Sequence, residues 1–361
     1  MENSETIVIN KRDLNSPYIE EMLLQEKVAK RDVERIDTKP VETSFWLNPV
    51  FYTACAGLLG AFIGWLLCEP ELGIIFNSDR FGITVMIYAI PALIGCFVSS
   101  VDSLVSGNSS RAIKVALIGF FVSTLAGFVC GIAGGLTINI IRTIGFTLIP
   151  GSFPSKGARF LYEWPAIGIY IMVMARTAAW TIVGVSMGIG PGIALKSKKL
   201  LYNGIIGGVL GGFLGGLFFD PICILSEILK GTAGGGALSR IVGFGFVGVF
   251  TGIFIGLIEN IAKEAWVKIR TGALRGKNFI MYHDVTVIGS SPRCDIYIFK
   301  DPKVEPMHAE IRRVSGKYQI VANGNYRLSV NGKEMKSKYL ENNDLITVGE
   351  SSFEFHQKES A

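Results

Sequence analysis

Arg176 is a charged residue in a strongly apolar stretch, I-Y-I-M-V-M-A-R-T-A-A-W. It lies about ten residues after the expected start of a hydrophobic helix, which at a rise of about 1.5 Å per residue places it roughly 15 Å deep in a bilayer. A charge at that depth costs about 3 kcal/mol or more, so it should face protein, water or a partner. We expect Trp180, one turn further on, to stack on the guanidinium.

The possible counter-charges for Arg176 are Asp220, Glu227 and Glu259. The run F-F-D-P-I predicts a helix end at Asp220, near the outer surface, whereas Glu259 should lie near the inner one. Neither matches the depth of Arg176, and Asp220 is expected to pair with Arg240 across a loop. Two interpretations of Arg176 stay open: a buried structural ion pair or hydrogen-bond hub, and an anion or substrate site.

The remaining reactive side chains do not form a catalytic pattern. The sequence has no G-x-x-x-x-G-K-[ST] or H-E-x-x-H motif. Its three histidines, His283, His308 and His356, all lie in the last quarter. We therefore expect no enzyme activity, no cofactor and no metal. The cysteines show no C-x-x-C spacing and are expected to be packing residues: Cys55, Cys68, Cys96, Cys130, Cys223 and Cys294.

Composition divides the 361 residues into regions of different character, with 49% hydrophobic and only 18% charged residues overall. Residues 1–44 are polar and predict a cytoplasmic segment with one helix. Residues 45–262 are very apolar and predict an all-α, polytopic membrane domain. Residues 263–272 are expected to be a juxtamembrane linker that continues the last helix to Gly272, with Trp266 at the membrane interface. Residues 273–361 resemble a soluble domain in composition.

The apolar region contains six stretches long enough to cross a hydrocarbon core, which needs about 20 residues. These stretches are expected at 48–68, 82–105, 111–136, 166–190, 200–219 and 239–261. They are rich in glycine at a spacing of four, and the stretch at 200–219 has two such rows. Small residues on one face let helices approach closely in lipid. Tight packing is the favoured interpretation, and a smooth-walled cavity is the alternative.

Loop charges predict the orientation of these helices. Arg111 and Lys114 lie at the connection between the second and third stretches, and Lys196, Lys198 and Lys199 lie at the connection between the fourth and fifth. Further Lys and Arg residues follow residue 262, whereas the 69–81 loop is acidic. This pattern places both termini in the cytoplasm and the protein in the cell (inner) membrane. The expected long loop 137–165 carries positive charge and opposes the rule. The net charge of +5 is small, and we read its distribution as a topology signal, with no nucleic-acid partner.

From about residue 273 the pattern changes to short alternating strands separated by turn signals, which predicts a β-sandwich. The ordered set I-G-S-S-P-R-C-D-I-Y-I, M-H-A-E-I, V-N-G-K, L-E-N-N-D-L-I-T-V-G and F-E-F resembles the forkhead-associated (FHA) family over about 275–356. The resemblance implies a small sandwich whose loops bind phosphothreonine peptides. It also implies that His308 braces those loops.

The sequence departs from the FHA pattern at the phosphate-contacting positions. Ser290 stands where the family has Arg, Glu305 where it has Ser, and Asn325 only approximates the family's Asn. Phosphate needs charge-assisted donors, and Arg293 and Arg312 are the candidate substitutes. The expected partner-binding residues are therefore Ser290, Ser291, Arg293, Glu305, His308, Arg312, Asn325 and Asn331.

The sequence thus predicts a membrane-anchored interaction or scaffold protein. Its FHA-like domain is expected to dock a cytoplasmic protein, with phosphothreonine recognition weakened or lost; retained recognition is the alternative. The helical domain would contact the lipid bilayer and form a homo-oligomer or a membrane complex. The rival hypothesis is a transporter or channel with a regulatory FHA-like domain, in which Arg176 lies near the permeation path. The predicted intramembrane polar residues are Arg176, Trp180 and Glu259.

Overall fold

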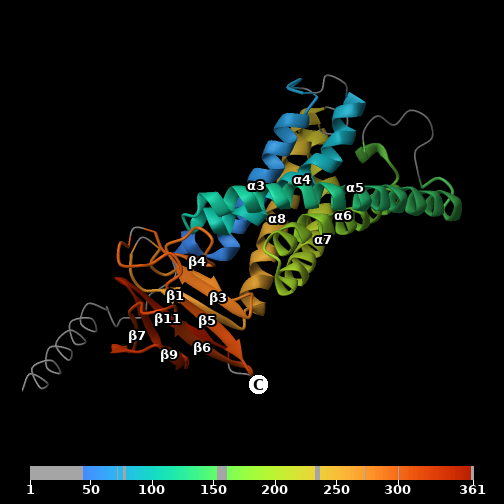
Figure 1. Cartoon of the computed structure of the whole chain (residues 1–361). Coiled ribbons are helices and arrows are strands. Elements are labelled where there is room, and N and C mark those ends of the chain that lie inside the picture. The colour runs from blue at the N-terminus through green and yellow to red at the C-terminus, as the bar shows by residue number, and fades with distance from the viewer. Residues whose placement is uncertain are drawn as a thin grey trace, which may run out of the picture. The chain divides into compact units, whose positions relative to one another are not determined.

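The computed structural model describes residues 44–70, 72–75, 79–152, 161–231, 236–272, 274–299 and 301–358. The helix expected in the N-terminal segment lies outside these residues. The chain divides into two compact units. One holds the helices and the other the strands (Figure 1).

Within the residues that the structure describes, the helical unit contains six helices that are long and apolar enough to cross a membrane. This confirms the predicted polytopic all-α domain. The helices are α3 (Pro49–Cys68), α4 (Asp79–Val105), α5 (Ser109–Leu148), α6 (Ala166–Ala194), α7 (Lys198–Lys230) and α8 (Gly236–Ala262), with short 3-10 turns η1 (Phe45–Leu47) and η2 (Leu161–Glu163). Asn48, Asn108 and Ser197 cap α3, α5 and α7 by accepting backbone N–H groups with their side chains.

Three of the expected helix ends were wrong. α5 continues to Leu148 through most of the expected long loop, because Thr137 and Asn139 bond back to carbonyls one turn earlier (2.9 and 3.0 Å) instead of breaking the helix. α7 passes through Pro221 to Lys230 and ends at Gly231 in a left-handed conformation. Membrane helices tolerate such a proline because neighbouring groups satisfy the freed carbonyl. α8 ends ten residues before the expected Gly272.

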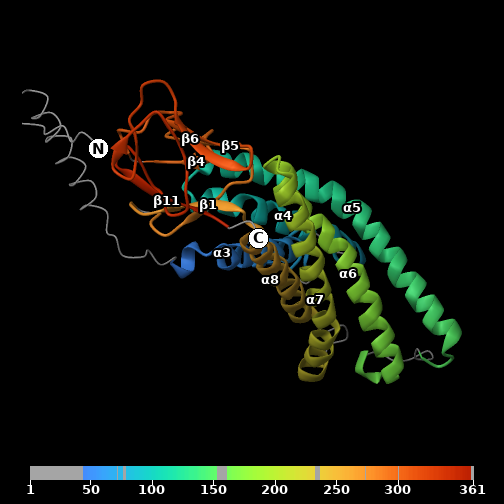
Figure 2. The same ribbon diagram turned by 90° about the horizontal axis from the view of Figure 1, so that it is seen from below.

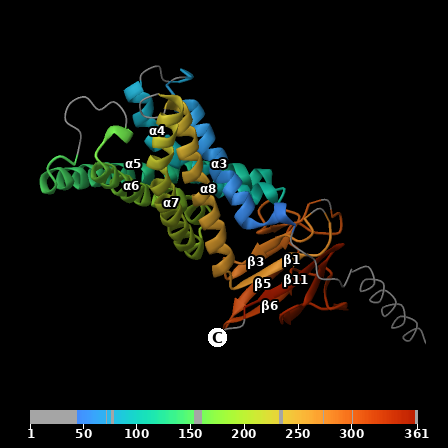
Figure 3. The same ribbon diagram turned by 180° about the vertical axis from the view of Figure 1, so that it is seen from behind.

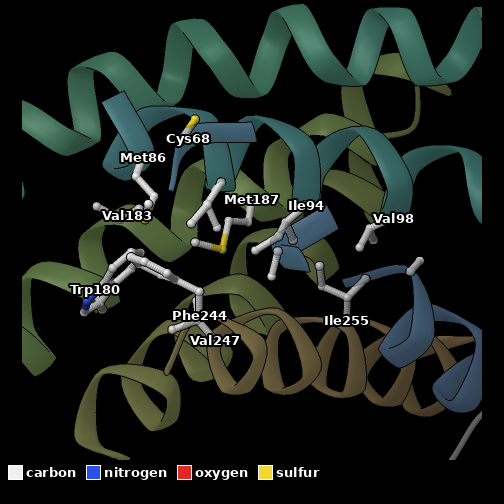
Figure 4. Close-up of a cluster of buried hydrophobic side chains, with 13 residues drawn as sticks. Cys68, Met86, Ile94, Val98, Trp180, Val183, Met187, Phe244, Val247 and Ile255 are labelled. Atoms are coloured by element: carbon white, nitrogen blue, oxygen red, sulfur yellow. The ribbon is translucent and has the colours of Figure 1, made fainter. Parts of the chain in front are cut away.

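Each helix packs against the next in sequence, α3 also packs against α8, and α4 contacts α6. Figures 2 and 3 show this neighbour order. The buried cluster at the centre draws side chains from α3, α4, α6 and α8 (Figure 4). Its members include Cys68, Met86, Ile94, Val98, Trp180, Val183, Met187, Phe244, Val247 and Ile255.

Glycines set the closeness of the α6–α7 contact. Gly184 faces the backbone of Gly208, and Gly188 faces that of Gly204. A Cβ atom added at any of these four positions would overlap a backbone oxygen of the other helix. The second glycine row of α7 lies against the backbone of α8. α7 therefore has close neighbours on two sides.

Replacing Gly188 by Ala should destabilise the helical unit by about 1–3 kcal/mol, because the two backbones must separate to admit the methyl group. The matched control is Gly135→Ala in α5, where nothing lies within 4 Å of an added Cβ. Thermal unfolding of both variants in nanodiscs measures the difference. Equal transition temperatures would contradict the close contact.

The second unit is a sandwich of two sheets, as the alternating pattern predicted. One sheet has the order β2-β1-β11-β10-β7-β8 and the other β4-β3-β5-β6-β9. The strands are β1 (Ala265–Ile269), β2 (Asn278–Ile280), β3 (Val285–Gly289), β4 (Ile296–Tyr297), β5 (Ala309–Val314), β6 (Lys317–Ala322), β7 (Leu328–Val330), β8 (Lys333–Glu334), β9 (Ser337–Tyr339), β10 (Leu345–Val348) and β11 (Ser351–Gln357).

β1 corrects the expected juxtamembrane linker. The segment A-W-V-K-I pairs antiparallel with β11, from Ala265 opposite Gln357 to Ile269 opposite Phe353. Its buried residues alternate with partly exposed ones, as in a strand with one covered face. Trp266 was expected at the membrane interface, but it stacks on His356 in the sheet at a ring distance of 5.3 Å.

Candidate partner-binding site

Backbone hydrogen bonds join three loops at one end of the sandwich. The β3–β4 loop contacts the β4–β5 loop where the Ser290 N–H donates to the Glu305 carbonyl at 2.9 Å. The next residue, Ser291, donates to the Pro306 carbonyl at 3.1 Å. The β6–β7 loop joins them through Asn323, whose N–H donates to the His308 carbonyl at 2.9 Å. The three loops therefore present a common surface.

His308 holds this arrangement from inside. Its side chain is only 2% exposed. Nδ1 accepts the Glu305 N–H at 3.2 Å, and Nε2 lies 2.8 Å from the Arg327 carbonyl oxygen. Because Nδ1 is an acceptor, the neutral ring carries its proton on Nε2 and donates to Arg327. His308 thus connects the β4–β5 and β6–β7 loops and acts as a positioning residue.

The outer face of these loops mixes apolar and charged side chains. Met307 is 51% exposed and Tyr326 is 41% exposed, and the Tyr326 ring lies 5.3 Å from that of His308. Arg293 and Glu305 are exposed beside them. We name Arg293, Glu305, Met307 and Tyr326 the loop face. Tyr, Met and Arg are enriched in protein–protein interfaces.

The loop face lacks the charge pattern that a phosphate needs. Ser290, at the family's Arg position, is half-buried and offers no cation, and Glu305 presents a carboxylate at the family's Ser position. Arg327 is exposed but pairs with Glu334 at 3.0 Å. Arg293 is the positively charged residue among the four that form the loop face. A carboxylate here opposes an incoming phosphate by like-charge repulsion.

Two of the sequence-predicted site residues lie away from the loop face. Arg312 is four residues along β5 from His308, roughly 13 Å in a strand, and pairs with Glu310 at 2.8 Å. Asn331 lies in the β7–β8 turn, at the other end of β7 from the loops, with a φ of 54°. It accepts the Leu345 N–H at 2.9 Å and therefore braces that turn.

The predicted Asn325 is exposed at the tip of the β6–β7 loop. The residue that bonds across the loops is Asn323, whose Nδ2 donates to the Met307 carbonyl at 3.2 Å and to Glu310 Oε1 at 3.3 Å. Sequence reasoning missed Asn323, Met307 and Tyr326. The adjacent V-A-N-G-N-Y turn contained the signal for Asn323, because Asn before Gly commonly bonds to nearby backbone.

Asp344 stabilises the turn region opposite the loop face. Burial opposes its ionisation, but the N–H of Glu341 and the side chains of Lys338 and Asn331 outweigh burial and lower its pKa. The Asp344 oxygens lie 2.8 Å from the Glu341 nitrogen, 2.8 Å from Lys338 Nζ and 2.7 Å from Asn331 Nδ2.

A carboxyl group with a lowered folded-state pKa contributes stability above its unfolded pKa of about 3.9, and this contribution is lost as the pH falls through the folded value. Asp344→Asn should therefore cost about 1–3 kcal/mol at neutral pH. It should also flatten the acid limb of the stability profile below about pH 4. Denaturant unfolding from pH 3 to 7 would contradict this if the two profiles stayed parallel.

In the helical unit, Arg176 forms an ion pair with Asp220, which is fully buried. The expected depth mismatch was wrong because α7 continues ten residues past Asp220, so both residues lie about 15 Å from their helix ends. Arg240 was the expected partner of Asp220, but its guanidinium donates hydrogen bonds to both carboxylate oxygens of Glu69, at 2.5 and 2.9 Å. This arrangement supports the structural interpretation of Arg176.

A group of aromatic rings lies on one side of Arg176. The Arg176 guanidinium lies 5.6 Å from the Phe219 ring centroid, where Trp180 was expected. Trp180 stacks on Phe219 at 6.3 Å and meets Phe244 edge-on at 5.6 Å. Glu259 is not near this group: it accepts a 3.4 Å hydrogen bond from Tyr282. The structure therefore does not bring Arg176, Trp180 and Glu259 into one site.

Residues 268–359 match the family described as "Inner membrane component of T3SS, cytoplasmic domain". The match covers about a quarter of the chain and falls on the sandwich. The two sheets confirm the all-β sandwich that the sequence predicted for this region. The described residues thus combine six helices that are long and apolar enough to cross a membrane with a sandwich that matches a cytoplasmic domain of an inner-membrane component. No curated protein matches the chain.

Solved FHA domains align with the same region. One, from an account of phosphothreonine-dependent FHA interactions, is 18% identical, with 27% of this chain and 100% of that chain covered and a TM-score of 0.25. The FHA domain of the CT664 protein from Chlamydia trachomatis is 20% identical, with 27% and 100% covered and a TM-score of 0.24. The N-terminal FHA domain of S. cerevisiae Rad53p, bound to a phosphothreonine peptide, is 18% identical, with 26% and 94% covered and a TM-score of 0.25.

Proposed function

We propose that this chain is a non-enzymatic scaffold of the inner membrane whose FHA domain docks a cytoplasmic protein without requiring phosphothreonine. The observation that carries the proposal is the loop face. Met307 and Tyr326 are its exposed apolar side chains, and the buried His308 fixes the loops that carry them. Glu305 occupies the position where a phosphate would need a hydroxyl donor.

The chemistry of the loop face favours a partner with an apolar contact and a charged rim. Large, exposed Met and Tyr side chains supply buried area on binding. Arg293 and Glu305 carry opposite charges. Their charge complementarity determines how a partner is aligned on the loop face more than it adds to the affinity. A partner that presents an apolar side chain between a basic and an acidic residue fits this surface.

The helical unit serves as the membrane part of the scaffold. Its close glycine contacts and the ion pairs Arg176–Asp220 and Arg240–Glu69 support a rigid bundle. The similarity of the sandwich to a cytoplasmic domain of an inner-membrane secretion component supports assembly into a membrane complex. The basic segments on one side of the bundle support cytoplasmic termini.

The test is capture of partners from native lysate by the full chain in nanodiscs, with and without phosphatase treatment. We expect the same proteins in both samples, and their loss with Met307→Asp. The matched control is Tyr339→Asp, because Tyr339 is 52% exposed on β9, away from the loop face. Capture that disappears after phosphatase treatment, or that survives Met307→Asp, would overturn the proposal.

A further inference from the structure

A second concave feature of the sandwich lies outside the loop face. It is a pocket of about 270 Å³ between β4, the edge strand of one sheet, and the β1–β2 connection and β10–β11 turn of the other. Its lining includes Ile269, Leu274, Tyr297, Phe299, Asp301 and Glu350. We name it the seam pocket. Small-molecule sites usually measure about 300–1,000 Å³, so this one suits a single long side chain.

Asp301 gives the seam pocket a desolvated negative charge. It is only 9% exposed. Its Oδ2 accepts the Glu350 N–H at 2.8 Å and the Ser351 hydroxyl at 2.9 Å, and its Oδ1 accepts the Lys303 N–H at 3.1 Å. Within the described ranges no cation pairs with Asp301. These three donors fix the carboxylate in place, and because each of them is neutral, none compensates its charge, which is costly for a buried group.

Aromatic rings form another wall of the seam pocket. Tyr297 and Phe299 stack with ring centroids 6.0 Å apart and an interplanar angle of 28°. Both residues are half-buried and line the pocket. A ring face attracts a cation, and a planar guanidinium also stacks on it. Rings and a fixed carboxylate in one pocket favour a cationic occupant over an apolar one.

Glu350 adds a second carboxylate at the rim. It pairs with Lys303 at 3.0 Å, and the two side chains are 64% and 66% exposed. An exposed pair of this kind contributes little stability. An incoming cation can therefore displace Lys303 from Glu350 at small cost.

We propose that the seam pocket binds the guanidinium of an arginine on an extended segment of a protein partner. The guanidinium lies over Tyr297 or Phe299 and directs its N–H groups at Asp301 and Glu350. Arg fits better than Lys because its planar fork can satisfy two carboxylates while it stacks. The segment itself lies along β4, whose outer edge is unpaired in the sheet. The inference rests on the proposed docking role and assigns it a second contact.

The test uses the full chain in nanodiscs with 13C-labelled Ile and Leu methyl groups. The reporters are the pocket methyls of Ile269, Leu274 and Ile298. The probes are three capped tripeptides with Arg, its neutral isostere citrulline, or Leu between two glycines. We expect the Arg peptide to shift the reporters with a roughly millimolar dissociation constant, and the other two peptides to bind at least about tenfold more weakly.

Variants separate the contributions. Asp301→Asn should weaken the Arg peptide about tenfold. Because this change can loosen the β10–β11 turn, Phe299→Leu provides a second variant, with a loss of about three- to fivefold from the missing ring. Lys303→Ala should strengthen binding slightly, since it removes the competitor for Glu350. Equal shifts with Arg and citrulline, or tighter binding of Leu, would overturn the proposal.

Met307→Asp, which disables the loop face, should leave the tripeptide titration unchanged. This variant distinguishes the two proposals. If Met307→Asp abolishes partner capture but the Arg peptide does not bind, the docking role stands and the seam pocket inference fails. If the Arg peptide binds and Met307→Asp has no effect on capture, the loop face fails and the seam pocket stands.

Discussion

Replacing Asp220 by Ala is expected to destabilise the helical unit by about 3–5 kcal/mol, the usual cost of removing one partner of a buried ion pair. Asp220 is fully buried, and the Arg176 side chain is 30% exposed. Without the carboxylate, the guanidinium keeps its contact with the Phe219 ring but loses its counter-charge. Thermal or denaturant unfolding in nanodiscs measures the loss.

The double variant Arg176→Ala with Asp220→Ala is the control. It removes both charges, so it should recover most of the stability that the single variant loses. The exposed pair Lys199–Glu264, at 2.7 Å, provides a matched surface comparison. Its disruption should cost less than about 1 kcal/mol. If the double variant is as unstable as Asp220→Ala alone, the unpaired guanidinium is not the cause.

His308→Ala is expected to abolish partner docking and to destabilise the sandwich by about 2–4 kcal/mol, because it leaves the Glu305 N–H and the Arg327 carbonyl without their partner and opens a cavity. The loops then lose the common geometry that presents Met307 and Tyr326. The readouts are unfolding of the full chain and capture of the same partners as wild type.

His308→Asn tests positioning separately from stability, because its side chain keeps one donor and one acceptor. It should restore part of the stability and part of the capture. His283→Ala, at a half-buried histidine outside the loops, is the matched control and should leave capture intact. Loss of stability with full retention of capture in His308→Ala would show that His308 does not position the loop face.

The sequence was sufficient to predict the six membrane helices, since length and hydropathy are strong signals. It was insufficient for their ends. Pro221 suggested that the helix ends at Asp220. Asp220 was therefore placed near the membrane surface and was not expected to pair with Arg176. Because α7 extends to Lys230, Asp220 lies at the same depth as Arg176 and pairs with it.

In the sandwich, alternation predicted most strands, but β1 was read as the end of a helix. A-W-V-K-I follows an apolar helix and carries the interfacial residues that mark a membrane exit, so local composition favoured the wrong element. Its partner β11 lies about 90 residues later, and such long-range pairing leaves no local signal. Asn323 differs from β1, because the Asn-Gly turn marked it locally, but its bonding partners Met307 and Glu310 lie in other segments and could not be read from that turn.

The central claim is that the loop face docks a protein without phosphothreonine. The most direct measurement compares binding of a phosphothreonine peptide library and its unphosphorylated counterpart to the full chain in nanodiscs. The account predicts no preference for phosphate in wild type, and a gain of at least about tenfold in the double variant Ser290→Arg with Glu305→Ser, which supplies the missing donors. A wild-type preference for the phosphorylated library of about tenfold or more, lost in His308→Ala, would contradict it.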